Sequence, residues 1–248
     1  MTDFLPAGLL DVAFAIAFGA TFLTGVMRGF AGFGAGMALV PVYGLLWGPV
    51  IAVPILILIE IPATLQLLPR AWKAIDWRAA LLLGIPAVVG ARFGAEMLVE
   101  LPADLMRQAT SVLVLIAVVA LWFGWRYRGR RPATLTAGVG ATTGLLAGAT
   151  GIGGPPVILY QLAADGPVER HRATLIGFYV PLEAALVTFY LMFGLFTAEV
   201  LWKSVLLAMP FMGGIVVGQH LFGVADEGAF RRVTLLFLGT VALYALFA

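Results

Sequence analysis

Two glycine-rich segments, residues 28–36 and 148–156, provide the first candidates for chemistry in this sequence. Glycine and proline allow a helix to break, and the free N–H groups at the start of the next helix can bind an anion without a cation. Broken backbone inside a membrane is tolerated where it is buried in protein or lines a wet cavity. We therefore expect an anionic substrate to be bound by Gly32, Phe33, Gly34, Gly36, Thr150, Gly151, Gly153, Gly154 and Pro155.

The alternative for these segments is close helix packing through small residues. It applies best to Gly25 with Gly29, and to Gly144 with Gly148, because each pair has the GxxxG spacing. It applies less well to residues 151–156, since two consecutive prolines do not fit an ordinary helix interior.

Two carboxyl groups, Glu60 and Glu183, lie near the centres of apolar stretches, one in each half of the chain. Ionisable side chains inside a membrane are costly and usually serve a function. Removing a carboxylate from water disfavours its charged form, so such a group can take up and release a proton. We interpret Glu60 and Glu183 as proton-coupling or gating residues. The alternative is a neutral or hydrogen-bonded glutamate that stabilises a helix break.

Arg92 is the basic residue that lies clearly within an apolar stretch, and a guanidinium can bind a small oxyanion bidentately. Glu96 follows four residues later, which is the spacing of a same-face ion pair, so a structural pair is the alternative. His220 is a further gating candidate because histidine titrates in a useful range, although a helix–helix hydrogen bond would explain it equally. Additional polar lining is expected from Tyr43, Gln66, Thr150, Tyr160, Gln161 and Tyr179.

The elements that position these residues are membrane-spanning helices. Of the 248 residues, 62% are hydrophobic and 11% are charged, and the mean hydropathy is +1.03. Soluble domains carry about 25% charged residues, so a chain this apolar requires a bilayer. Apolar stretches of about 20 residues, typical of spanning helices, occupy residues 7–27, 49–68, 77–99, 105–125, 133–149, 173–194, 200–222 and 233–247. The shorter segments 31–46 and 151–164 either cross partly unwound or dip in and return.

Two ordered sets of residues recur along the chain. At an offset of 119, Thr24, Gly25, Gly29, Gly32, Phe33 and Gly34 correspond to Thr143, Gly144, Gly148, Gly151, Ile152 and Gly153. At an offset of 124, Pro86, Gly90, Gly94 and Arg107 correspond to Pro210, Gly214, Gly218 and Arg231. The order of the two sets predicts one transmembrane domain over residues 1–248, built from duplicated halves at about residues 5–127 and 133–248.

Basic residues indicate how the halves are oriented, because cytoplasmic loops gather lysine and arginine. If both short segments cross, each half has five crossings, and twelve of the 15 basic residues lie inside: Arg28, Arg70, Lys73, Arg78, Arg126, Arg128, Arg130, Arg131, Arg170, Arg172, Arg231 and Arg232. If both segments are re-entrant, the split becomes eight inside and six outside. The first arrangement predicts about ten crossings in a 5+5 inverted repeat, with two glycine-rich interrupted helices and both termini outside.

The pattern Thr-Gly-x-x-x-Gly-x-x-Gly-Ile-Gly-Gly-Pro at residues 143–155 resembles the sulfite exporter TauE/SafE family of bacterial membrane proteins. The first copy departs from it, with Phe33 in place of Ile152 and Ala35-Gly36 in place of Gly154-Pro155. The resemblance implies a multi-pass protein of the inner membrane that exports small sulfur-containing anions, such as sulfite, sulfoacetate or isethionate. It also implies that ion gradients rather than ATP drive export, and no GxxxxGK[ST] loop is present.

We therefore predict a secondary transporter linked to the proton-motive force, whose partners are a small anion and membrane lipid, without a cofactor or nucleic acid. A homodimer is compatible with the sequence, because lipid-facing and subunit-facing apolar surfaces have the same composition. Two alternatives stay open: an uncoupled anion channel, and a membrane assembly or scaffold protein. An enzyme is not expected, because neither an HExxH nor a GxSxG motif occurs, and two histidines are too few for a histidine-rich metal site.

Overall fold

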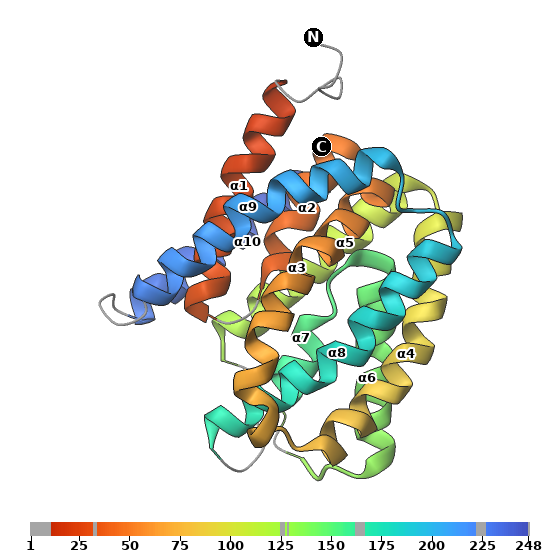
Figure 1. The fold of residues 1–248 in the computed structure, drawn as a ribbon, viewed down its shortest axis with the longest axis vertical. Helices are drawn as coiled ribbons and strands as arrows, with labels where there is room; N and C mark the ends of the chain where they lie inside the picture. Colours follow the sequence, from red (N-terminus) through yellow and green to blue (C-terminus); the bar gives the residue numbers. More distant parts are fainter. Residues whose placement is uncertain are drawn as a thin grey trace.

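The computed structural model describes residues 11–31, 34–124, 127, 129–161, 167–221 and 227–247. Within these ranges the chain forms ten α-helices and a short 3-10 helix, with no strand (Figure 1). The first five α-helices are α1 (Val12–Ala31), α2 (Ala35–Trp47), α3 (Pro49–Ala71), α4 (Trp77–Glu100) and α5 (Ala103–Trp122). The last five are α6 (Ala133–Thr150), α7 (Gly154–Gln161), α8 (Val168–Met192), α9 (Ala198–Leu221) and α10 (Glu227–Phe247).

Six of the described helices are long and apolar enough to cross a membrane, namely α1, α3, α4, α5, α8 and α9. The expected number of crossings was about ten. The two helices that follow the glycine-rich breaks are the shortest, with 13 residues in α2 and 8 in α7. At 1.5 Å per residue, neither spans a hydrocarbon core of about 30 Å. The chain is thus an all-helical, multi-pass membrane protein in which α2 and α7 are partial spans.

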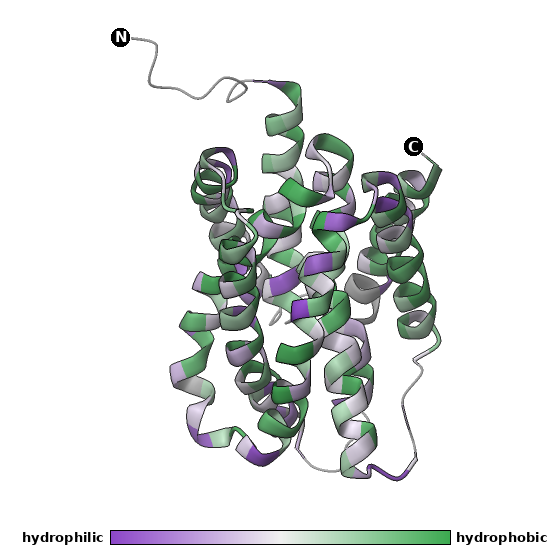
Figure 2. Ribbon diagram, turned by 90° about the vertical axis from the view of Figure 1, so that its right-hand side faces the viewer, coloured by the Kyte–Doolittle hydropathy of each residue, from purple (hydrophilic) through white to green (hydrophobic). Residues whose placement is uncertain are grey.

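The outer surface of the bundle suits a lipid environment. Large hydrophobic side chains on the outside of α4 and α9 are more than half exposed, among them Ile85, Phe93, Val205 and Met209. Apolar residues dominate the helices in Figure 2, and a soluble monomer rarely exposes so large a contiguous apolar surface. These faces therefore contact lipid.

The helices of the first half are interleaved with those of the second. Helix α1 packs along α9, α4 packs along α6, α3 packs against α8, and α5 packs against α10. Each short helix also packs against the helix before it, α2 against α1 and α7 against α6. The start of α1 and the end of α10 lie toward the same end of the bundle (Figures 1 and 2). The protein is therefore one interlocked unit rather than two lobes.

Glycine allows the closest of these contacts. A Cβ atom on Gly144 would collide with the backbone of Ala87 across the α4–α6 contact, and one on Gly25 would collide with the backbone of Phe211 across the α1–α9 contact. Gly29 and Gly148 likewise face the backbone of the opposite helix. The packing alternative considered for these four glycines is confirmed.

Candidate substrate site

A small cavity of about 50 Å³ opens where the two glycine-rich breaks meet the middle of α3 and α8. This volume is well below the range of about 300–1,000 Å³ typical of sites for drug-sized ligands, so the cavity suits only a small ligand. Its lining comes from both halves of the chain: Arg28, Gly34, Ala35, Gly36, Met37, Ile57, Glu60, Ala147, Gly151, Ile152, Gly153, Gly154, Pro155, Ile158, Tyr179, Leu182, Glu183 and Leu186. The cavity therefore depends on the interleaving of the halves.

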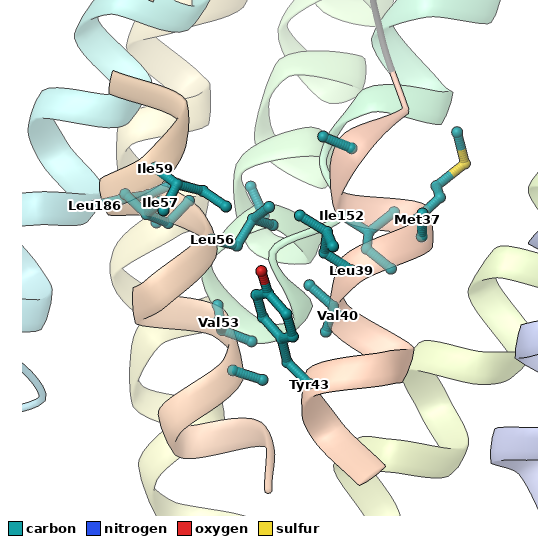
Figure 3. Packing of buried hydrophobic residues seen from close by; sticks show 14 of the residues in the cluster. Met37, Leu39, Val40, Tyr43, Val53, Leu56, Ile57, Ile59, Ile152 and Leu186 are labelled. Carbon is teal, nitrogen blue, oxygen red and sulfur yellow. The ribbon is translucent and has the colours of Figure 1, made fainter. Parts of the chain in front are cut away.

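The two breaks turn on glycines in the left-handed region, where φ is +100° at Gly34 and +69° at Gly151. A side chain would be strained in this conformation, which explains why glycine occupies both positions. The breaks also contact each other, since a Cβ atom added to Gly36 would stand 2.7 Å from the carbonyl oxygen of Gly151. Ile152 of the second break is buried beside Leu39 and Leu56 (Figure 3). The second break is thus wedged between α2 and α3.

Each break is followed by a helix whose N-terminus lines the cavity, α2 through Ala35 and Gly36 and α7 through Gly154 and Pro155. Pro155 and Pro156 fall in the first turn of α7, where proline is tolerated because the N–H group there has no intrahelical partner. Proline also removes N–H donors from that turn. The first turn of α2 contains no proline and keeps its N–H groups. Helix α2 therefore offers the cavity the fuller set of backbone donors.

Arg28, which the sequence analysis counted among the inner basic residues and not among the site residues, lines the cavity. Its Nε atom lies 3.8 Å from Oε1 of Glu60, and the two side chains are 13% and 17% exposed. Arg28 lies in the last turn of α1, where the helix dipole favours a cation. Its position at the start of the first glycine-rich segment was the signal that could have identified it.

The second carboxyl group, Glu183, is held from the other half of the bundle. Thr64 Oγ1 on α3 donates a hydrogen bond of 2.8 Å to Oε1 of Glu183 on α8, and both side chains are buried. Tyr179 lies one turn before Glu183 and also lines the cavity, as expected for a polar lining residue. At the offset of 119 that relates the breaks, Thr64 corresponds to Glu183 and Glu60 corresponds to Tyr179. Each half thus contributes one carboxyl and one hydroxyl at matched positions.

Most of the predicted glycine-rich residues are brought together at this cavity, namely Gly34, Gly36, Gly151, Gly153, Gly154 and Pro155. Gly32 and Phe33 lie outside the described residues. Thr150 is buried but is not part of the lining. Its hydroxyl donates to the carbonyl oxygen of Leu146 and accepts from the N–H of Ile152. Its role is to fix the end of α6.

The structure does not bring Arg92 or His220 to the cavity. Arg92 on α4 is about 39% exposed, bonds to Glu96 at 3.1 Å and lies 4.8 Å above the ring of Phe193. The face of α4 that is turned toward α6 consists of small residues, so a long side chain at position 92 points elsewhere. His220 is exposed near the end of α9, where its Nδ1 atom lies 2.7 Å from the carbonyl oxygen of Val216. For Arg92 the geometry favours the ion-pair alternative.

The sequence model of the family described as Sulfite exporter TauE/SafE matches residues 17–245. The chain belongs to the TauE/SafE family. The match extends from α1 to α10 and includes every residue of the cavity lining, so the resemblance drawn from residues 143–155 is confirmed. Comparisons with curated proteins and with solved structures find no match. TauE/SafE membership assigns the chain to membrane transporters of anions of the sulfite type.

Proposed function

We propose that this protein is a secondary transporter that exports a small sulfur-containing anion, such as sulfite, sulfoacetate or isethionate, through the cavity between the two breaks. The observation that supports this most strongly is the joint presence in one cavity of both breaks, the guanidinium of Arg28 and the carboxyls of Glu60 and Glu183. Packing alone would require none of these charged groups in the interior of the bundle.

Recognition of the anion follows from the groups that face the cavity. Backbone N–H groups at the start of α2 and the guanidinium of Arg28 supply donors suited to the oxygens of sulfite or a sulfonate. Such charge-assisted hydrogen bonds are shorter and about twice as strong as neutral ones. The small volume of the cavity suits a compact oxyanion.

The two carboxyls provide a means of coupling transport to protons. An anion that enters beside two carboxylates is repelled, since like unit charges 4 Å apart cost about 4 kcal/mol at an effective dielectric constant of 20. A proton on Glu60 or Glu183 removes part of this repulsion, so proton and anion bind together more readily than either binds alone. A proton that leaves with the anion moves against the proton-motive force, so export is driven by the membrane potential, which supplies about 2.3 kcal/mol per 100 mV for each net negative charge that leaves the cell.

Alternating access would use the inverted repeat that we propose for the ten helices. The packing supports it. In this repeat each of the helices α1 to α5 corresponds to the helix numbered five higher, so the α1–α9 contact corresponds to the α6–α4 contact and the α3–α9 contact to the α8–α4 contact. The contacts α3–α8 and α5–α10 each join a helix to its own equivalent in the other half. In transporters of this architecture the substrate site lies at the interface of the repeats, near the midplane, and the cavity between the two breaks would occupy that place. We place both termini outside the bacterial inner membrane.

Reconstituted protein tests this function against the channel alternative. Proteoliposomes carrying a pH gradient should accumulate sulfite above its equilibrium distribution, and collapse of the gradient should release it. The Glu60→Gln and Glu183→Gln variants should lose part or all of this uphill accumulation. Sulfite that only equilibrates would indicate a channel, and sulfite that does not move would contradict transport of this anion.

A further inference from the structure

The charged groups around the cavity are distributed unevenly. Among the described lining residues, Arg28 is the cation, and the titratable partners that face it are Glu60 from α3 and Tyr179 and Glu183 from α8. The described lining residues of α2, α6 and α7 contribute no titratable side chain. An anion that pairs with a cation among these lining residues must therefore compete with those titratable groups for Arg28.

Glu60 is the competitor already in place. Its Oε1 atom lies 3.8 Å from Arg28 Nε, a distance typical of an ion pair and longer than a hydrogen bond. A carboxylate and a sulfite or sulfonate group present the same chemistry to a guanidinium, namely a negative charge shared over oxygens that accept its forked donors. Glu60 and the transported anion therefore have interchangeable roles toward Arg28.

We propose that Glu60 is an internal competitor of the substrate: its carboxylate neutralises Arg28 in the cavity without anion, and the transported anion takes its place on the guanidinium. This inference rests on the proposed function and adds the determinant of affinity to it. A site that is ready to bind for only a fraction of the time shows an affinity reduced by that fraction. The return of Glu60 to Arg28 then promotes release of the anion, which a transporter requires in each cycle.

Glu183 provides a matched control within the same cavity. It is also a buried glutamate, but it accepts a hydrogen bond from Thr64. Replacement of either glutamate by glutamine removes one negative charge from the cavity while keeping the shape of the side chain. General repulsion of the anion predicts equal effects at the two positions, whereas competition for Arg28 predicts a much larger effect at Glu60.

The test is isothermal titration of the purified full-length protein with sulfite, and separately with isethionate, for the wild type, Glu60→Gln and Glu183→Gln. We expect Glu60→Gln to lower the Kd at least about tenfold, which corresponds to about 1.4 kcal/mol, and Glu183→Gln to lower it less than about threefold. In transport assays Glu60→Gln should lower both KM and the maximal rate, because binding is tighter and release is slower. A Kd for Glu60→Gln that is unchanged or higher, or equal effects of the two variants, would overturn the proposal.

A second variant at the same position, Glu60→Ala, controls for an effect of Glu60→Gln on folding. In Glu60→Ala, added formate supplies a free carboxylate and should raise the apparent Kd for sulfite toward the wild-type value, with little effect on the wild type itself. Formate that acts equally on both proteins would also overturn the proposal. If the wild type binds neither sulfite nor isethionate, the proposed function fails and this inference fails with it, whereas binding by the wild type without the Glu60 effect contradicts this inference alone.

Discussion

Thr64 and Glu183 are joined by a buried hydrogen bond of 2.8 Å between residues that lie 119 positions apart in the sequence. The bond links α3 of the first half to α8 of the second beside the cavity. Because 119 is also the offset between the glycine-rich breaks, the two residues occupy equivalent places in the proposed repeat. In that proposed repeat, a hydroxyl donor of one half therefore lies opposite a carboxyl of the other half.

Replacement of Thr64 by valine should destabilise the protein and impair transport. Valine keeps the shape of the side chain but leaves the Glu183 carboxyl without its donor, and the loss of a hydrogen bond to a charged group costs about 1.5–3 kcal/mol. Thr64→Ser retains the hydroxyl and should stay within about 1 kcal/mol of the wild type. Unfolding in detergent, followed for the three proteins, measures the difference. Equal stability of the valine and serine variants would show that the bond contributes nothing.

Replacement of Gly36 by alanine should lower transport at least about tenfold, a loss equivalent to about 1.4 kcal/mol. The new methyl group would stand 2.7 Å from the carbonyl oxygen of Gly151 and 3.2 Å from Cδ2 of Leu56, so α2 must move away from the second break. Gly44→Ala is the matched control on the same helix, because nothing lies within 4 Å of its added Cβ atom. Comparable transport by both variants would argue against a functional contact between the breaks.

The α4–α6 contact should be intolerant of added volume on its glycine face. Gly144→Ala brings a methyl group into the backbone of Ala87, and overpacking of this kind costs about 1–3 kcal/mol or more. Gly138→Ala, on the same helix, meets nothing within 4 Å and should leave the melting temperature unchanged or raise it, since alanine favours helix over glycine. The melting temperatures of both variants test the packing directly. A stable Gly144→Ala protein would be inconsistent with this geometry.

The proposed orientation can be measured with single cysteines, because the natural sequence has none. Ala74 and Ala198 are exposed at the α3–α4 and α8–α9 connections. We expect a membrane-impermeant maleimide to label Ala198→Cys in intact bacterial cells and to label Ala74→Cys only after the cells are opened. The opposite pattern would reverse the orientation, and labelling of both from outside would exclude the inverted repeat.

Hydropathy and the positions of glycine and proline predicted most of the helix order. The expected stretches 49–68 and 77–99 correspond to α3 and α4, the segment 31–46 covers α2 except for its last residue, and the segment 151–164 contains α7. These features are local, so the sequence reports them directly. The lengths of α2 and α7 were harder to predict from the sequence. Apolar composition continues on both sides of a break and does not mark where a helix begins.

The roles of the arginines depended on tertiary structure. Arg28 was counted among the inner basic residues, and the sequence did not show that it lies beside Glu60 at the middle of α3, in the last turn of α1. Arg92 was expected at the site because it lies within a span, but position along a span does not determine which face of the helix meets the cavity. That face is set by the contact of α4 with α6, which the sequence alone does not place.

The most direct test of the central claim compares sulfite transport by Arg28→Gln and Arg92→Gln in proteoliposomes. Arg28 lines the cavity, whereas Arg92 pairs with Glu96 outside it. The Arg28→Gln, Glu60→Gln double variant controls for the charge left unpaired in the single variant. We expect both proteins that lack Arg28 to lose at least about tenfold in transport, equivalent to about 1.4 kcal/mol, and Arg92→Gln to stay within about twofold of the wild type. Undiminished transport without Arg28, or loss of transport with Arg92→Gln alone, would contradict the assignment of this cavity as the substrate site.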